Sequence, residues 1–166
     1  MPELNIAVIG GSRVSQEVCT LSYNVGRILA KYNVVVFCGG LTGVMECVSK
    51  GVSEGNGIVV GILPGYDPSE ANDYVTIKVP TGMGYMRNFL IIRASQAVIS
   101  IDGSAGTLSE ASFAISEGKD VVSLFELNIP RKKEKEGHVY VEPDPEKAVQ
   151  MAIELAKNWK WHEENE

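Results

Sequence analysis

Three glycine clusters each follow a short apolar run, and together they suggest a site for an anion. Glycine lets backbone amides approach a phosphate closely, and the free N–H groups and dipole of a following helix add attraction. Tight turns need glycine in any case, so a single cluster would be weak evidence for a binding site. Three clusters together favour binding of a phosphorylated small molecule. The candidate binding residues in these turns are Gly10, Gly11, Ser12, Gly39, Gly40, Gly43, Gly103, Ser104, Gly106 and Thr107.

Two charged residues are placed to act on such a ligand. Glu110 comes about one helical turn after the third cluster, so its carboxylate would lie beside the bound molecule. The spacing Thr107-x-x-Glu110 fits a capping box equally well, with Thr107 as the helix cap. Arg87 lies at the start of an apolar segment. Its guanidinium could bind a phosphate through two parallel hydrogen bonds, or it could be a surface arginine paired with a carboxylate.

Several familiar motifs are missing from the sequence. The first turn reads GGSRVS rather than G-x-G-x-x-G, and the apolar run 34–38 ends without the acidic residue that binds ribose in dinucleotide folds. Neither a Walker A loop nor a G-x-S-x-G elbow is present. The three cysteines form no C-x-x-C pair and both histidines fall in the C-terminal quarter, so we expect no metal site.

The elements that must position these residues alternate between strand and helix. Continuous apolar runs predict strands at 4–9, 34–38, 58–63, 75–79, 97–101 and 121–125. Helical spacing of apolar residues predicts helices at 15–32, 44–54, 85–94 and about 145–159, the last introduced by Asp144 and Pro145. Residues 103–107 are predicted to turn into a further helix that continues through about Glu117. A charged C-terminal segment and helix occupy 126–166, and 131–136 is expected to be a mobile loop.

This alternation predicts an α/β fold, a Rossmann-like, doubly wound and mostly parallel sheet with helices on both faces. We expect one domain over residues 1–166. Ligands bind such sheets beyond the carboxyl ends of the strands, near the point where strand order reverses. The glycine clusters should therefore meet at that edge.

The composition of the chain limits the kinds of binding partner that we expect. The chain has 15 Lys and Arg against 21 Asp and Glu, a net charge of −6, so we expect no nucleic acid partner. No apolar run is long enough to span a membrane and no signal peptide is evident, so we expect no membrane partner. With an odd number of cysteines, these features predict a cytoplasmic protein in a reducing compartment.

At these turns the chain resembles the Lonely-guy type superfamily, which includes cytokinin-activating phosphoribohydrolases and molybdenum-cofactor carrier proteins. The phosphoribohydrolases carry Gly-Gly-x-x-Gly-x-Met, an Arg-Lys pair and P-G-G-x-G-T-x-x-E. Residues 39–45 match the first motif, while 87–88 and 102–110 match the others in part. The resemblance covers about residues 4–125.

The resemblance implies catalytic roles for Arg87 and Glu110, and it adds Met45 and Asn88 to the binding residues. Asn88 replaces the family's lysine, Asp102 its proline and Ser104 its second glycine. A carboxylate beside a phosphate cradle opposes anion binding. The compact length, the stretch 61–65 and the pair Arg87-Asn88 look more like the molybdenum-cofactor carrier branch.

Two functions follow as expectations. The first is carrier-like binding of a nucleotide or the molybdenum cofactor. The alternative is a phosphoribohydrolase that cleaves the N-glycosidic bond of a nucleoside 5′-monophosphate to give base and ribose 5-phosphate, with no cofactor required. Members of the superfamily are commonly dimeric or larger, so the resemblance implies a homo-oligomer, a dimer or tetramer, with the apolar helix 85–94 as its interface.

Overall fold

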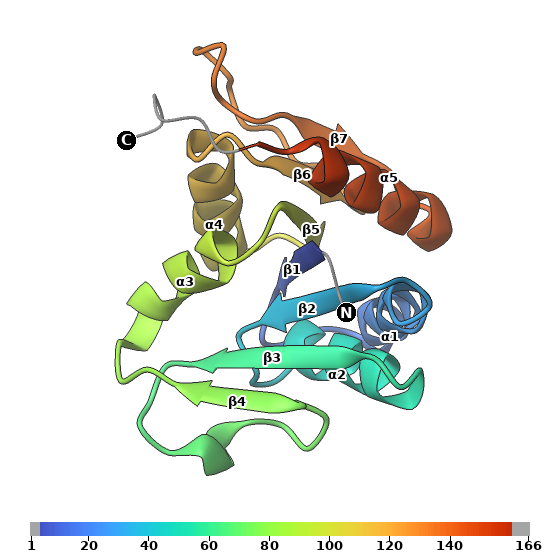
Figure 1. Cartoon of the computed structure of the whole chain (residues 1–166), viewed down its shortest axis with the longest axis vertical. Helices are drawn as coiled ribbons and strands as arrows, with labels where there is room; N and C mark the ends of the chain where they lie inside the picture. Colours follow the sequence, from blue (N-terminus) through green and yellow to red (C-terminus); the bar gives the residue numbers. More distant parts are fainter. Residues whose placement is uncertain (1–3, 161–166) are drawn as a thin grey trace.

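A computed structural model describes residues 4–160, and its strands form one seven-stranded sheet (Figure 1). The strands are β1 (Leu4–Gly10), β2 (Val34–Cys38), β3 (Ile58–Leu63), β4 (Ile77–Pro80), β5 (Ala97–Ile101), β6 (Asp120–Ser123) and β7 (Val139–Val141). Their order is β4-β3-β2-β1-β5-β6-β7, and every neighbouring pair is parallel. Parallel neighbours require crossover connections, which the helices supply.

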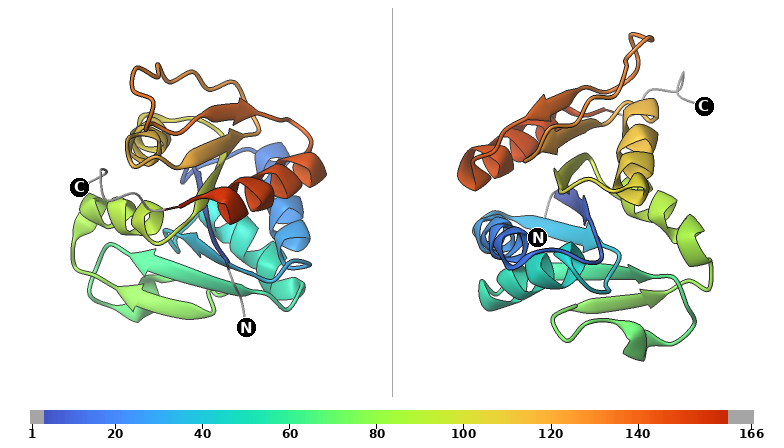
Figure 2. Two further views of the ribbon diagram at one scale, coloured as in Figure 1. Left: turned by 45° about the horizontal axis from the view of Figure 1, so that its top comes forward. Right: turned by 180° about the vertical axis from the view of Figure 1, so that it is seen from behind.

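Helices cover both faces of this sheet (Figure 2). They are α1 (Gln16–Leu29), α2 (Val44–Glu54), α3 (Arg87–Arg93), α4 (Ala105–Ser116) and α5 (Pro145–Asn158), with short 3-10 turns η1 (Pro68–Glu70) and η2 (Gly84–Met86). One apolar core joins α1, α2 and α5 to the sheet, and a second joins α3 and α4 to its other face. The predicted doubly wound α/β fold is confirmed.

The apolar runs read as strands because both of their faces are buried. In β1, Ile6 and Val8 belong to one core while Ala7 and Ile9 belong to the other. Such a strand has no solvent face on which a polar residue would be favoured. This explains why β1, β3 and β5 could be predicted from continuous apolar runs, without an alternation of apolar and polar residues.

The strand order reverses between β1 and β5. The chain runs outward from β1 to β4 and then returns through α3 to pair β5 with the other side of β1. Gly10 and Ile101 are register partners at the carboxyl ends of these strands. The turns that follow β1 and β5 are therefore neighbours, as expected if their glycine clusters form one site.

A disulfide joins α1 to α2, and the sequence analysis did not anticipate it. Cys19 and Cys47 are bonded, with their Cα atoms 5.4 Å apart, while Cys38 is free and buried. Disulfides are typical of oxidising compartments, although intracellular proteins of hyperthermophiles also contain them. The odd number of cysteines therefore does not indicate that all of them are reduced, and the expected cytoplasmic location stays a prediction.

Several element boundaries differ from the sequence prediction. The helix expected at 85–94 is divided into η2 and α3, and the strand expected at 75–79 is shifted to β4. Strand β7 was missed, and it lies inside the charged segment 126–166. Residues 131–136 form a turn held by its own hydrogen bonds, since Glu136 accepts from the amides of Lys132 and Lys133.

Within residues 4–160, none of the helices combines the length and apolar character needed to cross a bilayer.

Candidate functional site

The glycine clusters meet around one cavity of about 360 Å³ at the carboxyl edge of the sheet. It lies where strand order reverses, the usual ligand position in open α/β sheets. Ten of the residues singled out in the sequence line it: Gly10, Ser12, Gly39, Met45, Arg87, Asn88, Ser104, Gly106, Thr107 and Glu110. The three turns, 10–12, 39–43 and 103–107, therefore contribute to a single site.

Four residues singled out in the sequence do not line this cavity: Gly11, Gly40, Gly43 and Gly103. Gly40 and Gly43 shape the turn after β2, since both have a positive φ. Gly43 has φ +69°, and a Cβ there would lie 2.3 Å from the carbonyl oxygen of Gly11. The turns after β1 and β2 can approach this closely only with glycine at that position.

The N-terminus of α4 opens onto the cavity with no side chain capping it in the described chain. Ser104 is the N-cap residue, and its side chain makes no cap hydrogen bond. Thr107 therefore lies inside the first turn of the helix, buried, and Glu110 lies in the second turn. The capping-box interpretation of Thr107 and Glu110 is wrong because the helix begins three residues earlier than that motif requires.

The N-terminus of α2 is also without a side-chain cap among the described residues. Its N-cap is Gly43, which has no side chain to accept a hydrogen bond from the amides of the first turn. By contrast, Ser15 caps α1 through a bond from the amide of Val18 (3.2 Å), and Asp144 caps α5. Of these four helices, α2 and α4 thus lack a side-chain cap in the described part of the chain, and residues in their first turns line the cavity. An anion would satisfy the free amides at the start of such a helix.

Arg87 lies beneath the cavity, and it is buried, with 7% of its surface exposed. Its Nε donates to the carbonyl of Ile62 (2.8 Å), and Nη2 donates to the carbonyl of Gly39 (3.4 Å). Nη1 donates to the side-chain oxygen of Asn88. The alternative of a surface arginine paired with a carboxylate is therefore wrong.

Glu110 shares this environment. Burial raises the pKa of its carboxyl to about 7, and the opposing attraction of Arg87 only partly offsets that effect. Burial likewise lowers the pKa of Arg87, against the opposing influence of Glu110. A carboxyl that titrates near neutrality inside a cleft is typical of functional sites.

Asp102 occupies the edge of the β5 turn without lining the cavity. It is one of two described non-glycine residues with positive φ (66°), and its Oδ1 accepts from the amide of Gly103 (2.8 Å). Its other oxygen would lie 3.4 Å from a Cβ on Gly11. A negative charge is thus held between the turns after β1 and β5.

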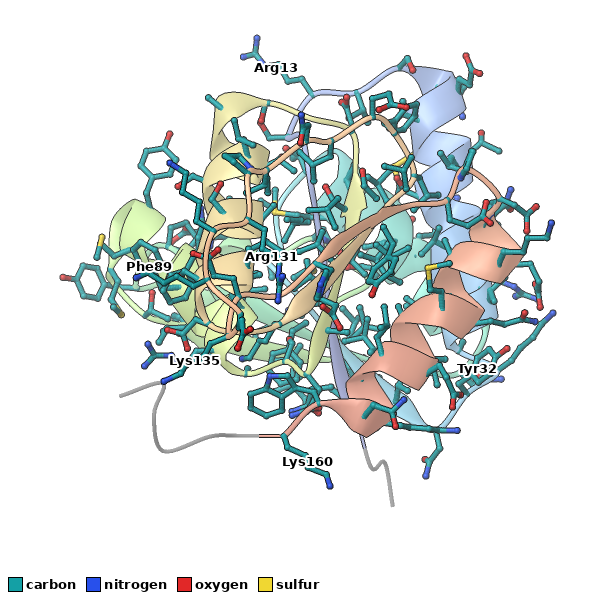
Figure 3. The ribbon with its side chains drawn as sticks, turned by 90° about the horizontal axis from the view of Figure 1, so that it is seen from above. Arg13, Tyr32, Phe89, Arg131, Lys135 and Lys160 are labelled. Carbon is teal, nitrogen blue, oxygen red and sulfur yellow. A yellow bond between two sulfur atoms is a disulfide. The ribbon has the colours of Figure 1, made fainter. Side chains whose placement is uncertain are left out.

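Sequence reasoning missed the apolar wall of the cavity, formed by Val8, Ile9, Leu41, Tyr85 and Ile91. Leu41 lies inside the second glycine cluster, and Tyr85 lies two residues before Arg87. Their nearness in the sequence to these candidate site residues was the signal that could have identified them. Arg13, in the first turn, points away into solvent (Figure 3).

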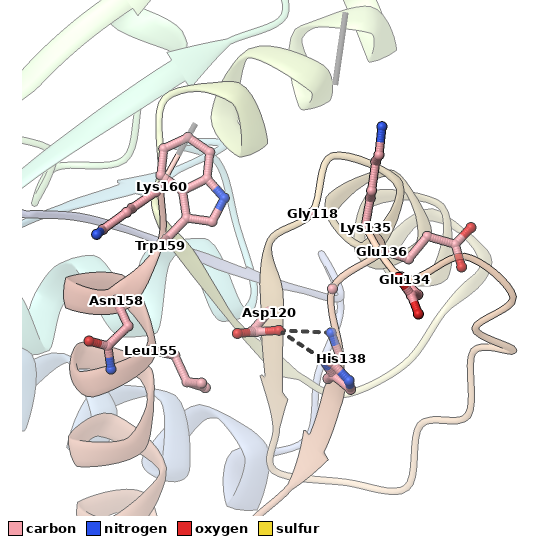
Figure 4. A pocket seen from close by; sticks show the side chains of 11 residues that line it. Gly118, Asp120, Glu134, Lys135, Glu136, His138, Leu155, Asn158, Trp159 and Lys160 are labelled. Carbon is pink, nitrogen blue, oxygen red and sulfur yellow. Dashed lines mark hydrogen bonds and ion pairs between the residues drawn. The ribbon is translucent and has the colours of Figure 1, made fainter. Parts of the chain in front are cut away.

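A larger hollow of about 480 Å³ lies elsewhere, between β6, the turn 134–138 and the end of α5 (Figure 4). Its best-defined feature is an ion pair of 3.6 Å between Asp120 and His138, which is half exposed. Its lining includes the turn glycines Gly118 and Gly137, but no residue from the first turn of a described helix. Over residues 4–160, no group of three or more His, Cys, Asp or Glu side chains could hold a metal ion.

Comparison with known proteins identifies the family. A family model described as the SLOG cluster4 family matches residues 3–149. An uncharacterized protein of Archaeoglobus fulgidus is 41% identical over 124 residues, covering 75% of this chain and 82% of that protein.

Two solved structures share the fold over nearly their whole length. The molybdenum cofactor binding protein of Rippkaea orientalis is 28% identical, with a TM-score of 0.72 over 97% of this chain and 89% of its own. The structural-genomics target TM1055 is 32% identical, with a TM-score of 0.84 over 92% of this chain and 99% of its own. On the extent of the family match, this chain belongs to the SLOG cluster4 family.

Proposed function

We propose that this protein binds a phosphate-bearing small molecule, a nucleotide or the molybdenum cofactor, and acts as its carrier. The observation that supports this most strongly is the convergence of two helix N-termini without side-chain caps on one cavity underlain by a buried arginine. Main-chain amides and a guanidinium are the groups that proteins use to hold phosphate. The likeness to the Rippkaea orientalis protein, which binds molybdenum cofactor, supports the same class of ligand.

The cavity offers different surfaces to the two ends of such a ligand. The phosphate would sit at the start of α4, against the amides of 105–107 and the hydroxyls of Ser104 and Thr107. A planar ring would lie along Leu41, Met45 and Ile91, three apolar residues that line the same cavity. Arg87 supplies positive charge from below.

Asp102 sets a limit on the affinity. Its carboxylate lies beside the turns that would receive the phosphate, and like charges repel. The bound anion is therefore less stable than it would be without Asp102. A carrier benefits from this, because it must release what it binds.

The raised pKa of Glu110 favours a second function, hydrolysis of a nucleoside 5′-monophosphate. Water would add to the anomeric carbon as the N-glycosidic bond breaks, giving free base and ribose 5-phosphate. The ionised Glu110 would orient this water and stabilise the positive charge that develops on the ribose. No cofactor takes part in this reaction.

Calorimetric titration with adenosine 5′-monophosphate (AMP) and with adenosine tests the binding function. We expect AMP to bind and adenosine to bind at least tenfold more weakly, because adenosine lacks the phosphate. Arg87→Ala should weaken AMP binding. Arg93→Ala is the matched control, since Arg93 lies at the other end of α3 in a surface ion pair with Glu117. Equal affinity for AMP and adenosine, or no AMP binding, would refute the proposal.

Release of adenine from AMP distinguishes the carrier from the hydrolase. If wild type releases adenine and Glu110→Gln binds AMP without releasing it, the protein is a hydrolase that uses Glu110. If wild type binds AMP and leaves it intact, the carrier function stands and the alternative is excluded for this substrate.

A further inference from the structure

The disulfide lies close to the proposed binding site. Cys19 is the fourth residue of α1 and Cys47 the fourth residue of α2, so the bond joins the first turns of both helices. These are the helices that follow the first two glycine clusters. The bond therefore fixes the starts of the two elements that lead away from the cavity.

Direct contacts connect those helix starts to the turns. The amide of Val44 donates to the carbonyl of Gly11 (3.0 Å), and the hydroxyl of Thr42 donates to the carbonyl of Ser12 (3.0 Å). The turn after β2 and the start of α2 are thus hydrogen-bonded to the turn after β1. A change in the spacing of α1 and α2 would act on both turns.

Both sides of the bond are open to the surface. One hollow of about 400 Å³ and another of about 420 Å³ are each lined by Cys19 and Cys47. The second hollow also includes Ser12 and Gly43, and Ser12 lines the ligand cavity as well. Cys38 is inaccessible, with 0% of its surface exposed.

We propose that the Cys19–Cys47 bond is a site of thiol–disulfide exchange with a dithiol reductant, and that opening it weakens ligand binding at the glycine turns. The second half rests on the proposed function. One thiolate of the reductant attacks a bridge sulfur, and the other cysteine leaves as a thiolate. The second thiol of the reductant then displaces the first cysteine. The protein gains two thiols, and the reductant becomes a disulfide.

Alkylation of the folded protein tests the exchange without any ligand. After treatment with dithiothreitol under native conditions, iodoacetamide should add two carbamidomethyl groups, at Cys19 and Cys47, and none at Cys38. The untreated protein should gain none. If the bond opens only after the protein is unfolded, the exchange site is refuted, whatever the protein binds.

Titration of both redox forms with AMP tests the coupling. We expect the dissociation constant of the reduced protein to be about fivefold higher or more, a modest value for coupled sites. The variant Cys19→Ser/Cys47→Ser should match the reduced form and should not respond to dithiothreitol. If AMP binds both forms equally, the coupling is refuted and the proposed function stands.

If AMP binds neither form, the proposed function fails and hydrogen exchange still decides the coupling. Reduction should then raise the exchange rates of the amides in 11–15 and 39–43. Unchanged rates in these segments would refute the link between the bond and the turns.

Discussion

At the scale of single residues, the site depends on a charged pair in which burial prevails over attraction. Arg87 lies near Glu110, yet the pKa of Glu110 still rises to about 7. Arg87 directs its donors to the carbonyls of Ile62 and Gly39 and to Asn88. We infer that a guanidinium occupied in this way neutralises a nearby carboxylate only in part.

This pair predicts how stability depends on pH. The pKa of Glu110 is about 7 in the folded chain and near 4.5 when exposed, so the folded state binds more protons between these values. Its contribution to the free energy of unfolding is therefore fully present below about pH 4.5 and falls as the pH rises to about 7. Urea unfolding between pH 5 and pH 8 should show this decline in wild type relative to Glu110→Gln. Parallel pH profiles for the two proteins would contradict the assigned environment.

A second prediction concerns the hydrogen bonds of Arg87. In Arg87→Lys, the compact ammonium cannot reach both the Ile62 and Gly39 carbonyls, so at least one buried acceptor loses its partner. We expect a loss of about 1–3 kcal/mol in the free energy of unfolding. Arg93→Lys, at an exposed ion pair, should change it by less than about 1 kcal/mol. Chemical denaturation measures both, and equal losses would refute the buried role.

Local sequence could suggest these residues but not settle their roles. The glycine turn indicated that Glu110 would lie near a ligand, while the start of α4, on which the capping alternative depended, was misplaced by a short distance along the chain. The contact of Arg87 with Ile62 joins residues 25 positions apart, so no local pattern contains it. Resemblance to a family favoured catalytic roles for Arg87 and Glu110, and these roles stay predictions.

At the scale of elements, buried strands were the most predictable feature. The bounds of β2, β3 and β5 agree with the sequence prediction because their apolar runs are bounded by glycine, proline or polar residues. Strand β7 has three residues at the edge of the sheet, two of them exposed, and so carries little hydrophobic pattern. Its pairing with β6 is a tertiary effect that propensity does not predict.

The contact between α1 and α2 predicts a strict requirement for glycine. A Cβ at Gly51 would lie 2.1 Å from the carbonyl oxygen of Tyr23, so Gly51→Ala must push the helices apart. Alanine favours a helix over glycine by about 1 kcal/mol, and we expect the clash to outweigh that gain by about 1–3 kcal/mol. Thermal unfolding should show a lower melting temperature for Gly51→Ala.

Ser53→Ala is the control for that measurement, because Ser53 is exposed on the same helix. It should leave the melting temperature nearly unchanged. A Gly51→Ala variant as stable as wild type would show that the two backbones are not in close contact.

At the scale of the whole molecule, an apolar surface lies over η2 and α3. Tyr85 is 90% exposed and Met86 57% exposed, and Phe89 and Leu90 extend the same surface. Phe89 lies at the outer side of the molecule (Figure 3). Clustered exposed apolar side chains mark interaction surfaces, and a second copy of the chain is the partner that the family resemblance implies.

This surface predicts a homodimer in solution. Light scattering at micromolar concentration should give about twice the 18.0 kDa mass of the chain, and Leu90→Glu should return it to the monomer. Lys157→Glu, an exposed change on α5 across the sheet, should leave the dimer intact. A monomeric wild type would refute the assignment of this surface.

The central claim is that the turns after β1, β2 and β5 offer their main-chain amides to one anion. Amide chemical shifts of the ¹⁵N-labelled protein, followed during titration with AMP, report on those groups directly. We expect the largest changes at Ser12, Gly39, Gly106 and Thr107, which line the cavity, and we expect these changes to saturate. Changes confined to the hollow beside Asp120 and His138, or no saturable change, would contradict the account.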